Sequence, residues 1–213
     1  MNETATAPQL SVHQLSLARG PKRLFADLNW QLHAGQAMIL RGANGSGKTS
    51  LLRVLSGLTA ADAGEVRWCN QRWSPLCSAQ RESSLYLGHA NALKAELSAD
   101  ENLLDALAFD GIEPDVAARA NALDAAGLAG RHQLPARRLS QGQQRRVGLA
   151  RLALSRKPLW LLDEPTNALD AEGVAIFSTL LDAHLRGGGL ACVATHLPLA
   201  VSANMRELAL GEN

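Results

Sequence analysis

A glycine-rich segment that lies between two apolar stretches carries the strongest chemical signal in the chain. Its eight residues match the pattern G-x-x-x-x-G-K-[ST] in full: Gly42, Ala43, Asn44, Gly45, Ser46, Gly47, Lys48 and Thr49. Glycines let the backbone curl so that successive N–H groups face one phosphate, and a helix that follows adds the positive end of its dipole. We therefore predict a nucleotide site that also includes Ser50, because a surface turn with a lysine would not need this strand-loop-helix context.

Two side chains of this segment and two later carboxylates could carry the reaction. Lys48 can reach the β- and γ-phosphates, and the Thr49 hydroxyl can ligate Mg²⁺. Asp163 and Glu164 end the apolar run 159–162. Asp163 can hold Mg²⁺ through water, and Glu164 can orient or deprotonate an attacking water. The alternative for this acidic pair is capping of the next helix.

A histidine follows a further apolar run, residues 190–194. If that strand lies beside the strand that ends at Asp163, the imidazole of His196 would point toward the γ-phosphate and could donate a hydrogen bond to it. A single histidine is often structural, so this role depends on the order of the strands.

Residues 139–146 hold a second feature that could bind an anion. Ser140, Gln141, Gly142 and Gln143 precede a predicted helix over 145–155, and a serine and a glycine at a helix start expose N–H groups and a hydroxyl. The first loop already serves one triphosphate, so a second such feature calls for a second nucleotide. A head-to-tail dimer, in which each serine closes on the partner's nucleotide, meets this need; an ordinary helix N-cap is the alternative.

Hydrophobic periodicity predicts the elements that must position these residues. Residues 10–17 and 28–32 alternate loosely, as in a half-exposed antiparallel sheet with a turn at Gly20 and Pro21. Short apolar runs at 37–40, 159–162 and 190–194 are typical of buried strands, and helices are predicted over 50–58, within 100–128 and over 174–185. Strands that alternate with helices predict an α/β fold with a parallel sheet covered on both faces.

Composition limits the class of protein. The 213 residues fit one domain and are 46% hydrophobic, and the net charge of +1 argues against a nucleic-acid-binding protein. Cys69, Cys77 and Cys192 have no metal-binding or haem-attachment spacing and are expected to be free thiols. Neither a secretory signal nor a run of about 18 apolar residues that could cross a bilayer is visible.

The order of these motifs resembles that of ABC ATPase domains over nearly the whole chain. Walker A lies at 42–49, a signature at 139–143, Walker B at 159–164 and an H-loop at His196, and the D-loop consists of Asn167, Ala168, Leu169 and Asp170. The resemblance implies a P-loop NTPase (RecA-like) core at about 1–88 and 156–213, with an N-terminal antiparallel β subdomain and an inserted helical subdomain at about 89–155. It also implies that a homodimer binds and hydrolyses two ATP molecules and drives a membrane partner.

Three departures from the family pattern stand out. Gln141 replaces a glycine of the signature, and His89 stands where the family commonly has the Q-loop glutamine, which makes His89 a candidate Mg²⁺ ligand. The aromatic residue that usually stacks on adenine is missing, and Arg19 lies near that position, where its guanidinium plane could stack instead.

The stretches 87–103, 139–152 and 195–199 are similar to the ATP-binding subunit of the bacterial cytochrome c maturation system. That resemblance implies haem export or release of haem from its carrier protein, integral membrane permease partners, and a peripheral location on the cytoplasmic face of the inner membrane. Because such a subunit contacts its membrane partner, we expect no direct haem binding. The alternatives are the ATPase of another ABC transporter, for a lipid or a drug, and a soluble ABC protein that works on ribosomes or DNA. A P-loop kinase is disfavoured by the signature and by His196.

Overall fold

The computed structural model describes residues 9–73 and 78–211. An antiparallel sheet with strand order β2-β1-β4-β5 forms its N-terminal part. The strands are β1 (Gln9–Arg19), β2 (Lys22–His33), β4 (Ala63–Trp68) and β5 (Gln71–Arg72). Strands β1 and β2 form a hairpin that turns at Gly20 and Pro21, as predicted, and β1 has one buried and one largely exposed face. The predicted half-exposed antiparallel sheet is therefore confirmed.

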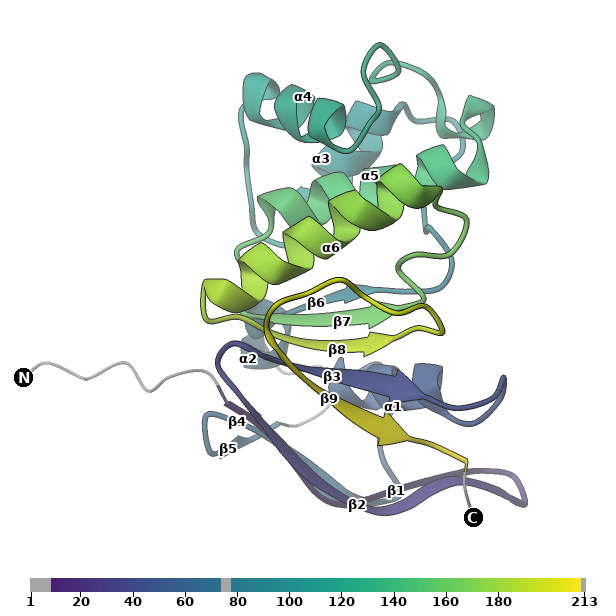
Figure 1. Ribbon diagram of the computed structural model, residues 1–213, viewed down its shortest axis with the longest axis vertical. Helices are drawn as coiled ribbons and strands as arrows, with labels where there is room; N and C mark the ends of the chain where they lie inside the picture. The colour runs from purple at the N-terminus through teal and green to yellow at the C-terminus, as the bar shows by residue number, and fades with distance from the viewer. Residues whose placement is uncertain (1–8, 74–77, 212–213) are drawn as a thin grey trace, which may run out of the picture.

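A parallel sheet with strand order β6-β7-β8-β3-β9 forms the middle layer (Figure 1). Its strands are β3 (Gln36–Arg41), β6 (Ser84–Leu87), β7 (Leu159–Asp163), β8 (Leu190–Ala194) and β9 (Asn204–Ala209). Each neighbouring pair in this sheet runs parallel, which confirms the α/β prediction. The carboxyl ends of β3, β7 and β8 consequently lie at one edge, where α/β sheets bind ligands.

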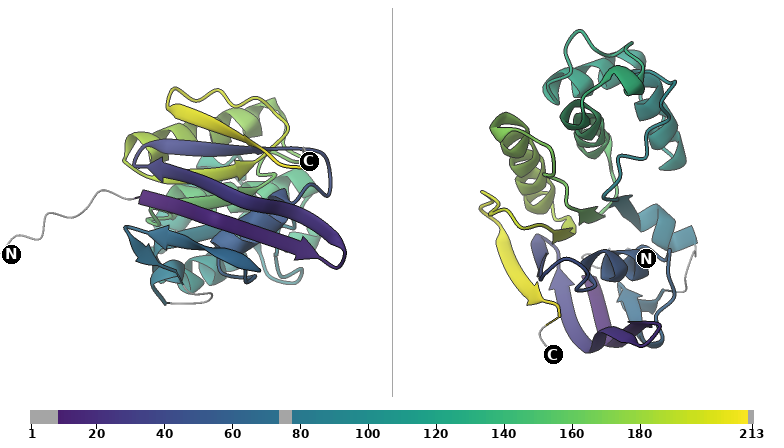
Figure 2. Two further views of the ribbon diagram at one scale, coloured as in Figure 1. Left: turned by 90° about the horizontal axis from the view of Figure 1, so that it is seen from below. Right: turned by 90° about the vertical axis from the view of Figure 1, so that its right-hand side faces the viewer.

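Helices cover both faces of the parallel sheet. They are α1 (Lys48–Leu55), α2 (Ser78–Ser83), α3 (Ala99–Phe109), α4 (Val116–Ala125), the short 3₁₀ helix η1 (Ala136–Arg138), α5 (Gln141–Leu154) and α6 (Ala171–Arg186). Helix α6 lies along one face of the sheet, and α3, α4 and α5 lie beyond it at the top of the molecule, as Figures 1 and 2 show. The other face packs on α1 and the antiparallel sheet.

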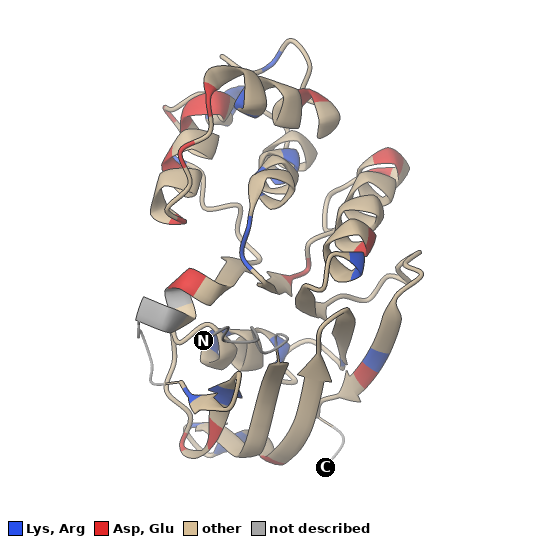
Figure 3. Cartoon of the chain, turned by 90° about the vertical axis from the view of Figure 1, so that its left-hand side faces the viewer, with Lys and Arg blue, Asp and Glu red and all other residues tan. Residues whose placement is uncertain are grey.

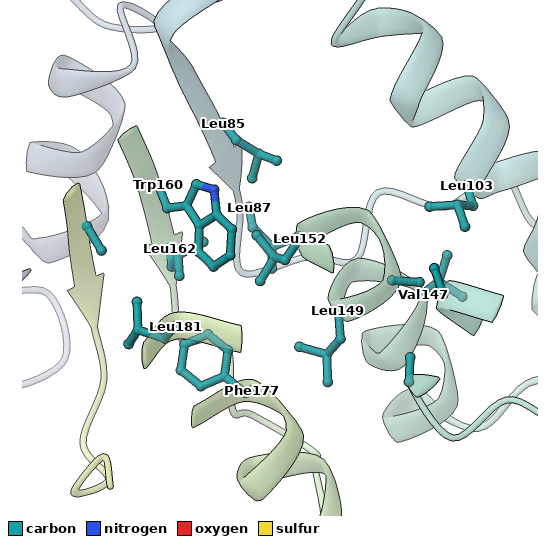
Figure 4. Close-up of a cluster of buried hydrophobic side chains, with 14 of the residues drawn as sticks. Leu85, Leu87, Leu103, Val147, Leu149, Leu152, Trp160, Leu162, Phe177 and Leu181 are labelled. Atoms are coloured by element: carbon teal, nitrogen blue, oxygen red, sulfur yellow. The ribbon is translucent and has the colours of Figure 1, made fainter. Parts of the chain in front are cut away.

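Strand β7 shows how the sheet divides the interior into two cores. Because successive side chains of a strand point to opposite faces, Leu159 and Leu161 join the core of α1 and the antiparallel sheet, whereas Trp160 and Leu162 join the core of the helical side. On that side, Phe177 of α6 and leucines of α5 pack toward β7 (Figure 4). The ends of β7 are therefore held from both faces.

The starts of three helices differ from the prediction. Helix α6 begins at Ala171 rather than at residue 174, because Asp170 caps it. Helix α1 spans Lys48–Leu55 rather than 50–58, because it starts directly after Gly47 of the phosphate-binding segment. Helix α5 begins at Gln141 rather than at residue 145, because Ser140 caps it. Hydrophobic periodicity missed these three starts because the first turn of each helix is polar or small.

The described cysteines, Cys69 and Cys192, are free, as expected, and burial raises the pKa of the Cys192 thiol; Cys77 lies outside the described residues. Lysine, arginine and acidic residues are interspersed over the helical and the sheet parts in the view of Figure 3. Within residues 9–73 and 78–211, none of the helices combines the length and the apolar character needed to cross a membrane.

Candidate functional site

The glycine-rich segment connects the end of β3 to the start of α1. Gly42, Gly45 and Gly47 have positive φ angles of 141°, 77° and 108°, which residues other than glycine rarely adopt. A Cβ atom at Gly42 would lie 2.4 Å from the backbone oxygen of Leu210. The loop conformation therefore needs glycine both for its dihedral angles and for the close approach of the chain after β9.

The start of α1 leaves donors free for an anion. Gly47 is the N-cap residue, and no side chain caps the helix there, so the first N–H groups of α1 have no intrahelical acceptor. The Lys48 ammonium, only 7% exposed, donates to the backbone oxygens of Gly42 (2.6 Å) and Ala43 (3.1 Å). The Ser46 hydroxyl is buried without a partner among the described residues. These donors are either free or bonded only to backbone oxygens of the loop, and they converge on that loop, as a phosphate site requires.

The carboxylates at the end of β7 face this loop. The Thr49 hydroxyl donates to Asp163 Oδ2 at 2.8 Å, and Asp163 is 2% exposed. Strands β7 and β8 are neighbours, with Asp163 opposite Ala194, so the condition set for His196 is met. Its Nε2 lies 3.4 Å from Glu164 Oε1. The structure thus brings together the residues predicted to hold Mg²⁺, to activate water and to contact the γ-phosphate.

A cavity of about 580 Å³ opens beside these groups. Its lining contains the predicted Arg19, Asn44, Gly45, Gly47, Lys48, Thr49, Ser50, His89, Asp163 and Glu164, together with Lys22, Leu24 and Arg53. Asp163 and Glu164 are the acids of this lining, and Arg19, Lys22, Lys48 and Arg53 are the permanent cations. This excess of positive charge suits a polyanionic ligand.

Sequence reasoning missed Arg53 of the cavity lining and two further basic residues, Lys22 and Arg41, that the fold brings to the site. Lys22, at the start of β2, donates from Nζ to the oxygen of Gly45 at 3.0 Å. Arg41, the last residue of β3, donates from Nη1 to the oxygen of Thr195 at 2.6 Å and so ties the phosphate-binding strand to the segment of His196. Nothing in their local sequence distinguishes either from a surface cation, although the position of Lys22 after the predicted hairpin turn was available as a hint.

The serine-led start of α5 lies in a different cavity, of about 570 Å³. That cavity is lined by Ser140, Gln141, Gly142, Gln143, Gly127, Arg131, Arg146, Ala168, Asp170 and Glu172, and it shares no lining residue with the first. The Ser140 hydroxyl accepts from Gln143 N, and Gln143 Oε1 accepts from Ser140 N, which makes a capping box. The N-cap that the sequence offered as the alternative is therefore present, and residues 140–143 do not line the first cavity of their own chain.

The segment after Glu164 packs against this helix start. A Cβ atom at Gly142 would lie 2.6 Å from the oxygen of Ala168, so the glycine permits close contact between α5 and the loop 167–170. Asp170 caps α6 by accepting from Gly173 N, and it pairs with Arg146 at 2.7 Å. Asn167 is exposed and Leu169 packs partly against the helical-side core.

Comparison with known proteins identifies the family. The family model described as ABC transporter matches residues 25–167. The chain is 45% identical over 205 residues to the cytochrome c biogenesis ATP-binding export protein CcmA of Dechloromonas aromatica, covering 95% of this chain and 100% of that protein. It is 48% identical to CcmA of Rhodopseudomonas palustris, with 95% and 98% covered, and 41% identical to CcmA of Vibrio cholerae, with 95% and 99% covered. The chain belongs to the CcmA family of ABC transporter ATP-binding proteins.

Solved structures agree with this fold. An ABC transporter ATP-binding protein from Pyrococcus furiosus superposes with a TM-score of 0.80 at 20% identity, covering 94% of this chain and 97% of that chain. The ATP-binding cassette MJ0796, solved as a dimer bound to ADP and Pi after hydrolysis, superposes with a TM-score of 0.78 at 24% identity, with 94% of each chain covered. The combination of antiparallel and parallel sheets is therefore that of the ABC ATPase fold. The family match and the CcmA relatives make the chain an ABC-type ATPase that binds ATP.

The ABC ATPase offers oxygen donors that fit Mg²⁺. A hydroxyl and a carboxylate, on Thr49 and Asp163, lie in hydrogen-bond contact beside the phosphate loop, and Mg²⁺ prefers such hard ligands together with substrate phosphates and water. No cluster of three His, Cys, Asp or Glu side chains that could form a protein-only metal site occurs in the described part of the chain. His89 lines the same cavity, but an imidazole is a poorer match for this ion.

Replacing Ser140 of this ABC ATPase with alanine tests whether the serine does more than cap a helix. Ser98 forms the same kind of capping box with Glu101 at the start of α3, away from both cavities. Loss of either cap is expected to cost about 0.5–2 kcal/mol in the free energy of unfolding. If the Ser140 hydroxyl also contacts a phosphate, only Ser140→Ala is expected to lower ATP hydrolysis, by about 10-fold or more. Equal hydrolysis by the two variants, measured beside thermal unfolding, would leave Ser140 with a structural role alone.

Proposed function

We propose that this ABC-type ATPase powers a membrane complex of bacterial cytochrome c biogenesis that exports haem or releases it from its carrier protein. The observation that supports this most strongly is identity of 41–48% to CcmA proteins over about 95% of the chain. The partners would be integral membrane permease subunits, with the chain bound peripherally on the cytoplasmic face of the inner membrane. The cassette acts as one domain, with its core at about 1–88 and 156–213 and a helical subdomain at about 89–155.

The working unit in this proposal is a head-to-tail homodimer. The separation of the two cavities supports it, since Lys48 and Glu164 line one cavity and Ser140 lines another on the same chain. A second copy can bring its residues 140–143 to the open side of the first cavity and complete a cage around the triphosphate. The D-loop residues 167–170, which contact the start of α5, then lie at the interface between the subunits.

The predicted residues of the first cavity have separate tasks in hydrolysis. The Lys48 ammonium exchanges its bonds to the oxygens of Gly42 and Ala43 for phosphate oxygens. The free N–H groups of residues 42–50 cradle the phosphates, and Arg19 stacks on the base. Thr49 and Asp163, with His89 as a further candidate, would hold Mg²⁺, which would neutralise charge that develops on the phosphates.

Glu164 acts on the attacking water, and His196 acts on the γ-phosphate. The Glu164 carboxylate accepts a hydrogen bond from the attacking water and takes its proton as the new bond to the γ-phosphorus forms. The bond between the γ-phosphorus and the β-γ bridging oxygen breaks, and ADP is the leaving group. His196 donates to the γ-phosphate and stabilises charge in the transition state. The distance of 3.4 Å between His196 Nε2 and Glu164 Oε1 supports this pairing of roles.

The biological assignment is tested by complementation. A bacterium that lacks its own CcmA is expected to regain covalent haem attachment to a c-type cytochrome when it expresses this chain. Haem staining of the cytochrome and membrane retention of the chain are the measurements, and the chain with Lys48→Ala is the matched control. Normal ATP hydrolysis without any restored cytochrome c would instead favour an ABC transporter for a lipid or a drug.

A further inference from the structure

Arg145 of α5 is a buried cation whose hydrogen bonds go to the site backbone. It is 2% exposed. Its guanidinium donates to the backbone oxygens of Asp163 (2.8 Å), Glu164 (2.6 Å), Pro165 (3.1 Å) and Gly88 (2.8 Å), and to Asn91 Oδ1 (3.4 Å). This is one side chain that spans two segments far apart in the sequence.

The partners of Arg145 differ from those of the buried Arg119 and Arg146 and of the half-buried Arg151. Arg119, Arg146 and Arg151 each form an ion pair with one or more carboxylates, whereas Arg145 has no carboxylate in hydrogen-bond contact among the described residues. Burial lowers the pKa of the Arg145 guanidinium, and the charges of Asp163 and Glu164 offset part of that effect. A cation is buried without a paired anion only where fixed dipoles replace its hydration.

Three of the carbonyl groups that accept from Arg145 belong to residues 163–165, and these residues set the direction of the Glu164 side chain. The residue has a φ of 49°, a left-handed conformation that costs energy for a side chain other than glycine. Its N–H donates to the oxygen of Ala194, and its own oxygen accepts from Arg145 and from Asn167 N. Arg145 therefore helps to hold the strained turn that points the carboxylate toward the phosphate loop.

The second segment that Arg145 holds, residues 88–91, lies beside the same cavity. His89 lines the nucleotide cavity and also a neighbouring groove of about 390 Å³ that includes Leu58, Tyr86 and Ala90. Gly88 and Asn91 on either side of His89 accept from Arg145 Nη1. A displacement of this segment would therefore change bonds on the same guanidinium that fixes the peptides of residues 163–165.

We infer that Arg145 is a positioning residue for ATP hydrolysis, which sets the turn at Glu164 and ties it to residues 88–91. This inference rests on the proposed role of Glu164 as the base. The guanidinium has the number and fan of donors needed to reach both segments at once. A lysine ammonium is a single point with three donors and cannot span them.

The test compares Arg145→Lys and Arg145→Gln with the unaltered chain. We expect kcat for ATP hydrolysis to fall by about 10- to 100-fold, because a small misplacement of the base is costly. The KM for ATP and the affinity for ATP in nucleotide binding should stay within about 2-fold, since Lys48 and the phosphate loop are untouched. Arg119→Gln is the matched control, because Arg119 is also buried but binds Asp100 on α3, and it should lower stability without changing kcat.

Amide hydrogen exchange gives a second readout that does not depend on hydrolysis. In Arg145→Gln, exchange should rise together in residues 88–91 and 163–167, whereas Arg119→Gln should affect α3 and α4. The inference is overturned if kcat stays within about 2-fold of the unaltered chain, or if exchange rises in only one of the two segments. A Glu164→Gln variant with normal turnover would instead contradict the role of Glu164 as the base. Faster exchange in both segments of Arg145→Gln would still show that Arg145 connects residues 88–91 to residues 163–165.

Discussion

Glu164→Gln is expected to bind ATP normally and to hydrolyse it about 10²- to 10⁴-fold more slowly. An amide keeps the size and shape of the side chain but cannot take a proton from water. The phosphate-binding groups, above all Lys48 and the loop glycines, are unchanged by this replacement. Nucleotide should therefore accumulate in the bound, unhydrolysed form, and the proposed closed dimer should persist.

The measurements are steady-state phosphate release, ATP binding and the molecular mass in the presence of ATP and magnesium. Glu101→Gln is a suitable control, because glutamine also satisfies a capping box and Glu101 lies on α3, away from the cavity. Steady-state hydrolysis by Glu164→Gln at the rate of the unaltered chain would remove Glu164 from the role of base. A variant that also loses ATP binding would point to a part for Glu164 in holding the nucleotide.

Local sequence pattern predicted the strands that are buried on both faces and missed β4 and β9, which bury few side chains. Strands β3, β7 and β8 are short, apolar runs. A continuous apolar run is typical of a strand that is buried on both faces of a parallel sheet. In β9, by contrast, none of the side chains is fully buried, and β4 buries Val66 alone. These strands exist because a neighbour offers its backbone for pairing, which composition does not encode.

The same distinction separates the predicted and the unpredicted parts of the site. The phosphate loop is contiguous, so its glycines and lysine define its geometry within eight residues. Arg145 lies 57 residues from Gly88 and 18 residues from Asp163 along the chain. Its burial against backbone oxygens follows from how α5 crosses the ends of β6 and β7, and an arginine in a polar stretch gives no sign of that.

Two singly disabled subunits should restore each other's hydrolysis if each nucleotide is shared between copies. Lys48→Ala removes the phosphate-binding ammonium, and Ser140→Phe places a bulky side chain at an exposed helix start. Each variant alone should be nearly inactive. In a mixed dimer, one of the two sites combines the intact phosphate loop of the Ser140→Phe subunit with the intact signature of the Lys48→Ala subunit. Random pairing makes about half of the dimers mixed, with one of two sites whole, so activity near a quarter of the unaltered level is expected.

The reciprocal mixture separates a shared site from a self-contained one. When the unaltered chain is mixed with an equal amount of Lys48→Ala/Ser140→Phe, mixed dimers contain no whole site if sites are shared, and activity should fall to about a quarter. Self-contained sites would leave about half. Unlike restoration, this result does not require the two sites of a dimer to act independently. If the single variants fail to complement and half of the activity survives the double variant, Ser140 serves its own chain, and the separation of the two cavities has another cause.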